Sequence, residues 1–307
     1  MTTKNKQEEY HIPVMLNECL EGLDINPDGV YVDVTFGGGG HSKAIFEKLS
    51  DKGVLYALDQ DEDAKANVWN APNFNFIQSN FKFLSNQLKA RGVNSVDGIL
   101  ADLGVSSHQF DVEERGFSTR GDAVLDMRMN KVGSITAAEI LNNYEEEELV
   151  GIFRKYGEIK NARKLASEII QKRVGSQITT THEFVELLSK MAPKFKEHRY
   201  YAQVFQALRI EVNKELEVLE YFLLQASELL NPGGRLVVLS YHSLEDRIVK
   251  NFMKKGNFEG VMEKDFYGNP IKPLTEINRK PIIPEEYEMS QNSRSRSAKL
   301  RIAEKNG

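Results

Sequence analysis

The stretch "VDVTFGGGGHS", residues 32–42, decides how the first third of the chain folds. In it an apolar run ends in four consecutive glycines, and a helix-like run begins directly after them. Glycine lets other groups approach the backbone closely, but it loses more conformational entropy on folding than any other residue. The glycines could form only a tight turn, although four in succession are costly for that purpose alone. We therefore expect a ligand to contact this backbone.

Strand-like and helix-like runs alternate along the first third of the chain, which is typical of a parallel sheet covered by helices. The pattern then changes, because residues 106–203 show no convincing strand. Thr136 with Glu139 and Thr180 with Glu183 instead have the spacing of capping boxes, which indicates a helical insertion. The four strands expected before the insertion are residues 29–36, 53–59, 74–81 and 96–105.

The strand pattern returns in the last third of the chain. A long amphipathic helix is expected over residues 205–230, and an apolar strand follows within 235–243. Ser243 and Asp246 have N-cap spacing at the start of the next helix. A last strand is expected within "SRSRSAKLRIAE", residues 293–304. Together these features predict an α/β fold with a doubly wound sheet and an inserted all-helical domain.

Composition narrows the class of protein. The chain has 307 residues and a formal net charge of −5, and Cys19 is its only cysteine, which excludes an internal disulfide and a thiolate metal cluster. Its six histidines show no ligand spacing, so no metal site is expected. We expect no signal peptide, because the first residues of this sequence lack an apolar core, and no uninterrupted apolar segment reaches about 18 to 20 residues. We expect a cytoplasmic protein with no membrane partner.

The second strand end provides a partner for the glycine turn. Asp59 closes the apolar run "GVLYALD", where a carboxylate can hold the ribose hydroxyls of a nucleoside cofactor. The dinucleotide pattern GxGxxG fails, because Ser42 stands where the last glycine should be. S-adenosylmethionine fits better, since it has no pyrophosphate to place on the helix N-terminus. We therefore expect S-adenosylmethionine as the cofactor.

Two further strand ends carry candidate residues, because ligands of open α/β sheets bind beyond the carboxyl ends of the strands. Phe81 follows the third strand, where it could cover an adenine ring or join the core with Phe83 and Leu84. Asp102 ends the fourth strand, where it could cap a helix or act beside the methyl group of the cofactor. For Asp102 we favour the functional interpretation.

At this point the sequence resembles a known family, the bacterial small-subunit ribosomal RNA cytidine-N4 methyltransferases, also called MraW or RsmH. The resemblance spans almost the whole chain. It is carried, in order, by "HIPVMLNE" (11–18), "VDVTFGGGGHS" (32–42), "DLGVSSHQFD" (102–111), "RGFS" (115–118), "LDMRM" (125–129), "FQALRIEVNKEL" (205–216), "HSLEDRIVK" (242–250) and "RSRSAKLR" (294–301).

The resemblance implies a class I S-adenosylmethionine-dependent methyltransferase domain with a Rossmann-like sheet, over residues 1–110 and 211–307, and an inserted helical substrate-recognition domain over 111–210. A histidine at a helix start is usually a capping or packing residue, and only the resemblance makes His41 a cofactor contact. The cofactor-binding residues that it implies are Gly39, Gly40, His41, Asp59, Phe81, Asp102 and Gln109, and Asp102 is also the expected catalytic residue.

The implied reaction methylates the exocyclic N4 of a specific cytidine in the decoding (P-site) region of small-subunit (16S) ribosomal RNA, and the implied partner is that RNA within the 30S subunit. This amine is a poor nucleophile, so the enzyme must align it with the methyl group. The target base must also leave its stack and find an aromatic platform. Phe36, Phe117 and Tyr241 are equal candidates for that platform.

The charge distribution suggests where RNA would bind. Residues 154–214 carry 13 lysines and arginines against 6 acidic residues, whereas residues 1–102 and 103–153 each have a net charge of −6. Lysine-rich helices could simply be solvated, but a basic segment also suits phosphates. The candidate contacts are Lys194, Lys196 and Arg199 for phosphates, and Tyr200 and Tyr201 for stacking on unpaired bases unless these tyrosines belong to the core.

Two other functions stay open at the level of sequence. One is an amino-methyltransferase that acts on DNA or on another RNA position, although the resemblance leads us to expect no DNA substrate. The other is a ribosome assembly factor without enzymatic activity. The sequence does not reveal the oligomeric state, or whether naked RNA or an assembled subunit is the substrate.

Overall fold

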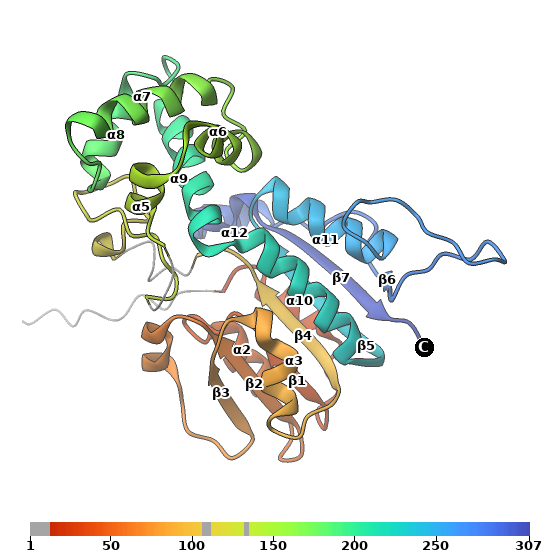
Figure 1. The fold of residues 1–307 in the computed structure, drawn as a ribbon. Helices are drawn as coiled ribbons and strands as arrows, with labels where there is room; N and C mark the ends of the chain where they lie inside the picture. Colours follow the sequence, from red (N-terminus) through yellow and green to blue (C-terminus); the bar gives the residue numbers. More distant parts are fainter. Residues whose placement is uncertain (1–12, 106–111, 132–134) are drawn as a thin grey trace, which may run out of the picture. The chain divides into compact units, whose positions relative to one another are not determined.

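The computed structural model describes residues 13–105, 112–131 and 135–307 of the chain (Figure 1). The chain separates into two compact units. The sheet unit comprises residues 1–59, 63–104 and 222–307, and the helical unit comprises residues 60–62 and 105–221. None of the helices described combines the length and the apolar character that a membrane crossing requires.

The sheet unit contains a seven-stranded sheet in the order β3-β2-β1-β4-β5-β7-β6, which confirms the expected doubly wound class I methyltransferase fold. Strands β1 to β5 run parallel, and β7 is antiparallel to both of its neighbours. The chain order reverses between β1 and β4, and a ligand crevice is expected outside the carboxyl ends of strands at such a point. The strands are β1 (Val30–Asp33), β2 (Val54–Asp59), β3 (Phe74–Gln78), β4 (Val96–Asp102), β5 (Leu230–Ser240), β6 (Leu274–Glu276) and β7 (Lys299–Lys305).

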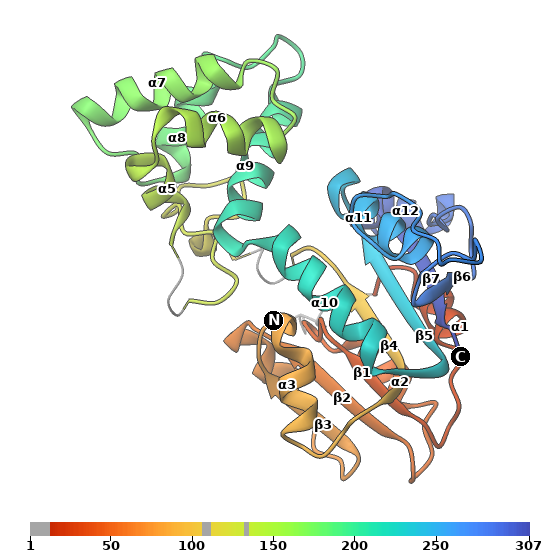
Figure 2. The same cartoon turned by 45° about the vertical axis from the view of Figure 1, so that its right-hand side comes forward.

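Helices cover both faces of this sheet. Figures 1 and 2 show α3 and α10 side by side on one face, and the side chain of Gln225 in α10 bonds to the backbone at the start of α3. The helices of this unit are α1 (Leu16–Leu23), α2 (Gly40–Phe46), α3 (Leu84–Lys89), α10 (Glu215–Leu229, which begins in the helical unit), α11 (Ser243–Lys255) and α12 (Glu286–Gln291), with short 3₁₀ turns at Glu62–Asn67, Phe81–Phe83 and Ser293–Ser297.

Two local predictions for the sheet unit are wrong. The helical run expected after the second strand forms only the 3₁₀ segment Glu62–Asn67. Helix α11 is capped by His242 and not by Ser243, which the spacing had suggested. The His242 ring accepts a hydrogen bond from the Glu245 backbone N–H, and the Glu245 carboxylate accepts one from the His242 backbone N–H. The N-cap acceptor here is a ring nitrogen, where a serine oxygen is more usual.

The helical unit has no strand among its described residues, as expected, apart from one isolated bridge between Val124 and Thr180. Both predicted capping boxes are present, at Thr136 with Glu139 and at Thr180 with Glu183. Its helices are α5 (Ala137–Asn143), α6 (Glu146–Lys155), α7 (Ala162–Gly175), α8 (Thr181–Ser189) and α9 (Glu197–Asn213), with a 3₁₀ turn at Glu113–Arg115.

The single helix expected over residues 205–230 is in fact two helices. Lys214 has a φ of 51°, in the left-handed region, so α9 ends at Asn213 and α10 begins at Glu215. The heptad-like spacing of leucine and valine continues through the break. Periodicity alone therefore could not reveal it, because each half of the pattern is correct for its own helix.

Candidate cofactor and catalytic site

The glycine turn lies between β1 and α2 and has the backbone of a ligand cradle. Gly37 and Gly39 have φ values of 49° and 77°, which residues with a Cβ rarely adopt. A Cβ at Gly40 would lie 2.3 Å from Cγ of Pro13, whereas a Cβ at Gly38 would meet nothing within 4 Å. The turn is therefore packed closely on one side and open at Gly38, which fits the close approach of a cofactor.

Asp59, at the end of β2, is tied to this turn. Its Oδ2 accepts a hydrogen bond of 2.7 Å from the backbone N–H of Gly37. The carboxylate thus stands beside the glycine backbone at the edge where ribose hydroxyls were expected. Both features suit a nucleoside cofactor such as S-adenosylmethionine.

Asp33 accepts hydrogen bonds from residues on both sides of the glycines. The Ser42 hydroxyl donates to its Oδ2 over 2.6 Å, and the Thr35 N–H donates to its Oδ1 over 3.0 Å. Burial raises the pKa of Asp33, although the bonds from Ser42 and Thr35 and the nearby His41 partly oppose this. Asp33 was not among the residues predicted from the sequence, although it is the last residue of β1 and lies just before the glycine turn.

Asp102 ends β4 and lies within a polar cluster. The Tyr241 hydroxyl donates a 2.7 Å hydrogen bond to its Oδ1, and its own backbone N–H donates to the Thr35 hydroxyl over 2.7 Å. Its Oδ2 lies 3.7 Å from Nδ1 of His41. Nε2 of His41 lies 3.0 Å from the Val14 carbonyl, and because a carbonyl only accepts, Nε2 carries the hydrogen.

The environment of Asp102 sets its ionisation. Its side chain is 24% exposed, and its burial raises its pKa above the ordinary value, helped by the negative charges of Asp33 and Glu245. The nearby His41 and the hydrogen bond from Tyr241 act in the opposite direction and favour the carboxylate. A partly desolvated carboxylate held by a fixed donor is a suitable acceptor for the hydrogens of an amine.

Phe81 follows β3 and is partly buried. Its ring packs edge-on against Phe222, with ring centres 5.3 Å apart. The side chain of Gln225 holds the surrounding turn, since it accepts from the Ser85 N–H over 2.9 Å and donates to the Lys82 carbonyl over 2.7 Å. The position of Phe81 is therefore compatible with both interpretations, a core residue or a cover for an adenine ring.

Of the three aromatic candidates for the base platform, two are poorly placed. Phe36 is 3% exposed and packs among Trp69, Phe74 and Phe76. Phe117 is 6% exposed and belongs to the core of the helical unit. Tyr241 is bonded to Asp102. Gln109, one of the residues implied by the family resemblance, lies outside the described residues.

Of the two interpretations of Tyr200, stacking on RNA or a place in the core, the structure supports the second. Tyr200 is 6% exposed, lies in the core of the helical unit and donates its hydroxyl to Asn161 over 3.2 Å. Tyr201 is partly buried against the same core. The exposed aromatic of this segment is Phe195, which sequence analysis overlooked. Its position between two lysines and two residues after a proline was the signal that could have found it.

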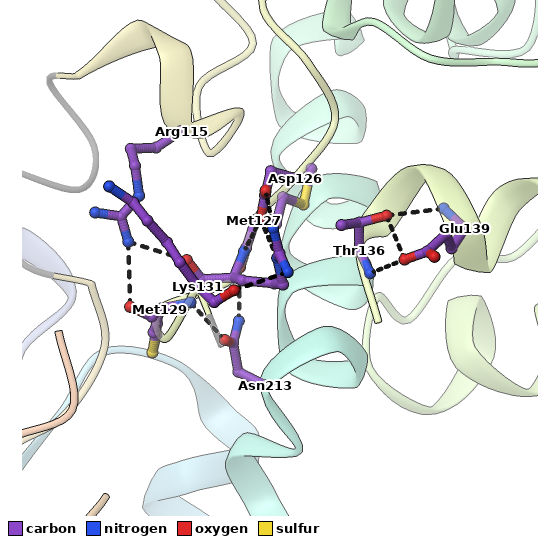
Figure 3. Close-up of polar contacts among 9 residues, drawn as sticks. Arg115, Asp126, Met127, Met129, Lys131, Thr136, Glu139 and Asn213 are labelled. Atoms are coloured by element: carbon purple, nitrogen blue, oxygen red, sulfur yellow. Dashed lines mark hydrogen bonds and ion pairs between the residues drawn. The ribbon is translucent and has the colours of Figure 1, made fainter. Parts of the chain in front are cut away.

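Three sequence motifs of the helical unit meet at one loop, residues 126–131. Arg115 of "RGFS" donates to the carbonyls of Arg128 and Met129, over 3.0 and 3.2 Å. Asn213, at the end of α9, donates to the Met127 carbonyl over 2.9 Å and accepts from the Met129 N–H over 2.8 Å. Figure 3 shows both side chains bonded to the backbone of this loop. These motifs therefore build the helical unit.

Arg115, which bonds to this loop, also forms a buried ion pair. Arg115 and Asp61 lie 3.0 Å apart and are each 7% exposed, and Asp61 follows Asp59 by two residues. The partner of Arg115 is thus two residues away in the chain from the carboxylate at the glycine turn.

The chain matches known proteins over nearly its full length. The model of the MraW methylase family matches residues 8–306. A ribosomal RNA small subunit methyltransferase H of Bacteroides fragilis (strain YCH46) is 56% identical, over 98% of this chain and 99% of the relative. The protein of the same name from Flavobacterium johnsoniae is 55% identical, over 97% and 98%. Among solved structures, an rRNA methylase from Streptococcus thermophilus is 12% identical, with a TM-score of 0.39 over 95% of this chain and 94% of that one.

Proposed function

The chain belongs to the MraW methylase family, and on that premise we propose that it methylates the exocyclic N4 of a cytidine in the decoding region of small-subunit ribosomal RNA. It is an S-adenosylmethionine-dependent ribosomal RNA methyltransferase. The observation that supports the site best is the arrangement of three neighbouring strand ends. There β1 leads into the glycine turn, β2 ends in Asp59, and β4 ends in Asp102.

The proposed cofactor site uses these strand ends. The backbone of Gly39 and Gly40 is proposed to contact the cofactor beside the open position at Gly38, Asp59 accepts hydrogen bonds from its ribose, and Phe81 covers its adenine. When bound, S-adenosylmethionine supplies an electrophilic methyl carbon on a positively charged sulfur. His41 keeps Nδ1 near Asp102 while Nε2 is held by the Val14 carbonyl.

The proposed catalytic residue is Asp102. Its carboxylate accepts hydrogen bonds from the N4 amine, which orients the nitrogen lone pair toward the methyl carbon. Transfer would form a bond between the nitrogen and the methyl carbon and break the bond between that carbon and the sulfonium sulfur, which would leave a neutral thioether. The amine would become positively charged, and the carboxylate would stabilise this charge and take the released proton. Tyr241 holds Oδ1, so that the carboxylate keeps one orientation.

The helical unit is proposed to hold the RNA, with its basic segment at residues 154–214. Lys194, Lys196 and Arg199 are all exposed there, whereas Arg173 donates to the carbonyls of Leu141 and Tyr144 and so serves the fold. We propose that the natural substrate is the RNA within the 30S subunit, in the cytoplasm.

A substrate comparison tests the function. The purified protein is incubated with radiolabelled S-adenosylmethionine and either 30S subunits, naked small-subunit RNA or duplex DNA. Label in the small-subunit RNA, recovered as N4-methylcytidine after digestion, is the expected result. Label in DNA, or at another RNA base, would identify a different amino-methyltransferase, and RNA binding without label would indicate an assembly factor.

A further inference from the structure

The turn between α8 and α9 presents an aromatic ring to solvent. Phe195 is 97% exposed and lies between Lys194 and Lys196, which are exposed as well. It is the most exposed of the large hydrophobic residues described in the helical unit. A single exposed hydrophobic residue is common on protein surfaces, so exposure alone decides nothing.

The backbone of Phe195 supplies a second observation. Its φ of 65° lies in the left-handed region, which is unfavourable for a residue with a Cβ and which glycine would adopt freely. The fold thus holds an aromatic side chain where glycine would be more stable. Neither its conformation nor its exposure stabilises the free protein, and residues kept at such a cost are concentrated at functional sites.

The turn is also held rigidly. The Phe195 N–H donates to Oε1 of Glu197 over 3.0 Å, and the Lys196 N–H donates to the Pro193 carbonyl over 3.1 Å. Met191 before the turn and Tyr200 after it are both buried in the core of the helical unit. The backbone of the turn is therefore ordered before any partner binds, which lowers the entropic cost of binding.

The charges around the ring identify the class of partner. Residues 190–199 contain four lysines and arginines and one glutamate, Glu197, whose carboxylate is already bonded to the turn. A positively charged surface around an exposed aromatic ring matches single-stranded RNA, because cations contact the phosphates and unpaired bases stack on the ring. An apolar protein partner would give Lys194 and Lys196 no counter-charges.

We propose that Phe195 is a stacking platform for an unpaired base of the RNA substrate, with Lys194 and Lys196 on the phosphates beside that base. This rests on the proposed function, since it assumes an RNA substrate, and it assigns to the helical unit a contact with a base other than the methylated cytidine. Such a contact strengthens RNA binding without taking part in methyl transfer.

The decisive variant is Phe195→Gly, because a platform and a merely structural residue predict different results for it. Glycine relieves the left-handed backbone, so the melting temperature should stay equal or rise. The loss of stacking should weaken binding to small-subunit RNA roughly tenfold at fixed salt, within the range known for base–aromatic contacts. KM for RNA should rise while kcat at saturating RNA stays unchanged.

Two further variants complete the experiment. Phe195→Trp keeps a stacking ring, so it should retain RNA affinity. RNA should quench its tryptophan fluorescence more than it quenches that of the wild type, which comes from Trp69. Phe266→Ala is the matched control, because Phe266 is 98% exposed in the sheet unit, and it should bind RNA normally.

Unchanged RNA affinity of Phe195→Gly would overturn the platform, as would an equal loss in Phe266→Ala or an unquenched Phe195→Trp. If the triple variant of Lys194, Lys196 and Arg199 to Ala still flattens the salt dependence, the RNA site in the helical unit stands and only the stacking inference fails. If the wild type neither binds nor methylates small-subunit RNA, the proposed function itself fails.

Discussion

At Asp102 two opposing effects set the ionisation of a single carboxyl group. Burial raises its pKa, while His41 and the Tyr241 hydroxyl favour the charged form. Only the charged form can take the proton that the amine releases, and the Tyr241 hydrogen bond favours that form. Burial raises the pKa of Tyr241, and the negative charge of Asp102 and the same hydrogen bond raise it further, so Tyr241 remains a donor at neutral pH.

Tyr241→Phe tests this arrangement. The ring stays in place against Gly104, and only the donor is lost. Turnover should fall roughly tenfold, as expected for one lost hydrogen bond to a charged group. Because the lost bond favoured the carboxylate, the pKa of Asp102 should rise further, and the acid limb of the pH–kcat profile should move to higher pH.

The matched control is Tyr31→Phe, which removes a hydroxyl that accepts from the Asn26 N–H at the far end of β1. It should leave the pH profile unmoved. The shift can also be measured without turnover, from the ¹³C resonance of the Asp102 carboxyl group, assigned by its absence in Asp102→Asn. A Tyr241→Phe titration identical to that of the wild type would show that the hydroxyl does not control Asp102.

Asp59 carries a separate prediction at the residue scale. If its carboxylate holds the ribose, Asp59→Ala should weaken cofactor binding by about 1.5 to 3 kcal/mol, measured by calorimetry. Asp59→Asn keeps an acceptor for the Gly37 N–H and separates support of the turn from ribose binding. Wild-type affinity in both folded variants would remove Asp59 from the site.

At the scale of elements, α11 and β7 are joined by charge. Asp246 of α11 accepts from Arg301 over 2.7 Å and from Lys299 over 3.2 Å, and its side chain is 14% exposed. The motifs "HSLEDRIVK" and "RSRSAKLR" therefore meet in the fold. Burial alone would raise the pKa of Asp246, but the bonds from Arg301 and Lys299 outweigh it and lower the pKa.

Asp246→Asn should accordingly destabilise the fold by roughly 1.5 to 3 kcal/mol at neutral pH, because Arg301 loses its buried counter-charge. A lowered folded pKa contributes stability that is complete above the unfolded value near 3.8 and disappears as pH falls through the folded value. The difference in urea midpoint between variant and wild type should therefore shrink below about pH 4. A difference that does not depend on pH would mean that packing, and not charge, joins α11 to β7.

The elements also show what the sequence could predict. Capping boxes, such as Thr136 with Glu139, involve neighbours in the chain, so their spacing was sufficient. The break at Lys214 was hidden, because a helical period continues on both sides of it. The burial of Tyr200 was hidden for a similar reason, since a tyrosine beside exposed Arg199 and Lys196 shows its direction only when the facing helices are known.

For the whole molecule, the basic segment of the chain lies within a single unit, which also contains the acidic residues 105–153. The basic residues 154–214 lie entirely within the helical unit. If this unit holds the RNA, replacing Lys194, Lys196 and Arg199 by Ala should reduce the salt slope of RNA binding by about 2, at about 0.7 per phosphate contact on a single strand. The affinity for S-adenosylmethionine, measured in parallel, should not change.

Much of the sheet unit was predictable from the sequence, because strand periodicity and the glycine turn are local features. The polar cluster around Asp102 was not, since Tyr241 lies 139 residues away in the chain and its hydroxyl reaches Asp102 only through the pairing of β4 with β5. Asp33 was likewise missed, because a buried carboxylate at the end of a strand resembles an ordinary strand ending until Ser42 is seen to bond to it.

The central claim is that this chain methylates N4 of a cytidine in small-subunit ribosomal RNA and that Asp102 is required for it. The most direct measurement is mass spectrometry of digested small-subunit RNA from cells that carry the wild-type chain, the Asp102→Asn variant or neither. We predict N4-methylation at one cytidine of the decoding region with the wild type, and none with the variant or without the protein. The same methylation in all three samples, or full methylation with Asp102→Asn, would contradict the account.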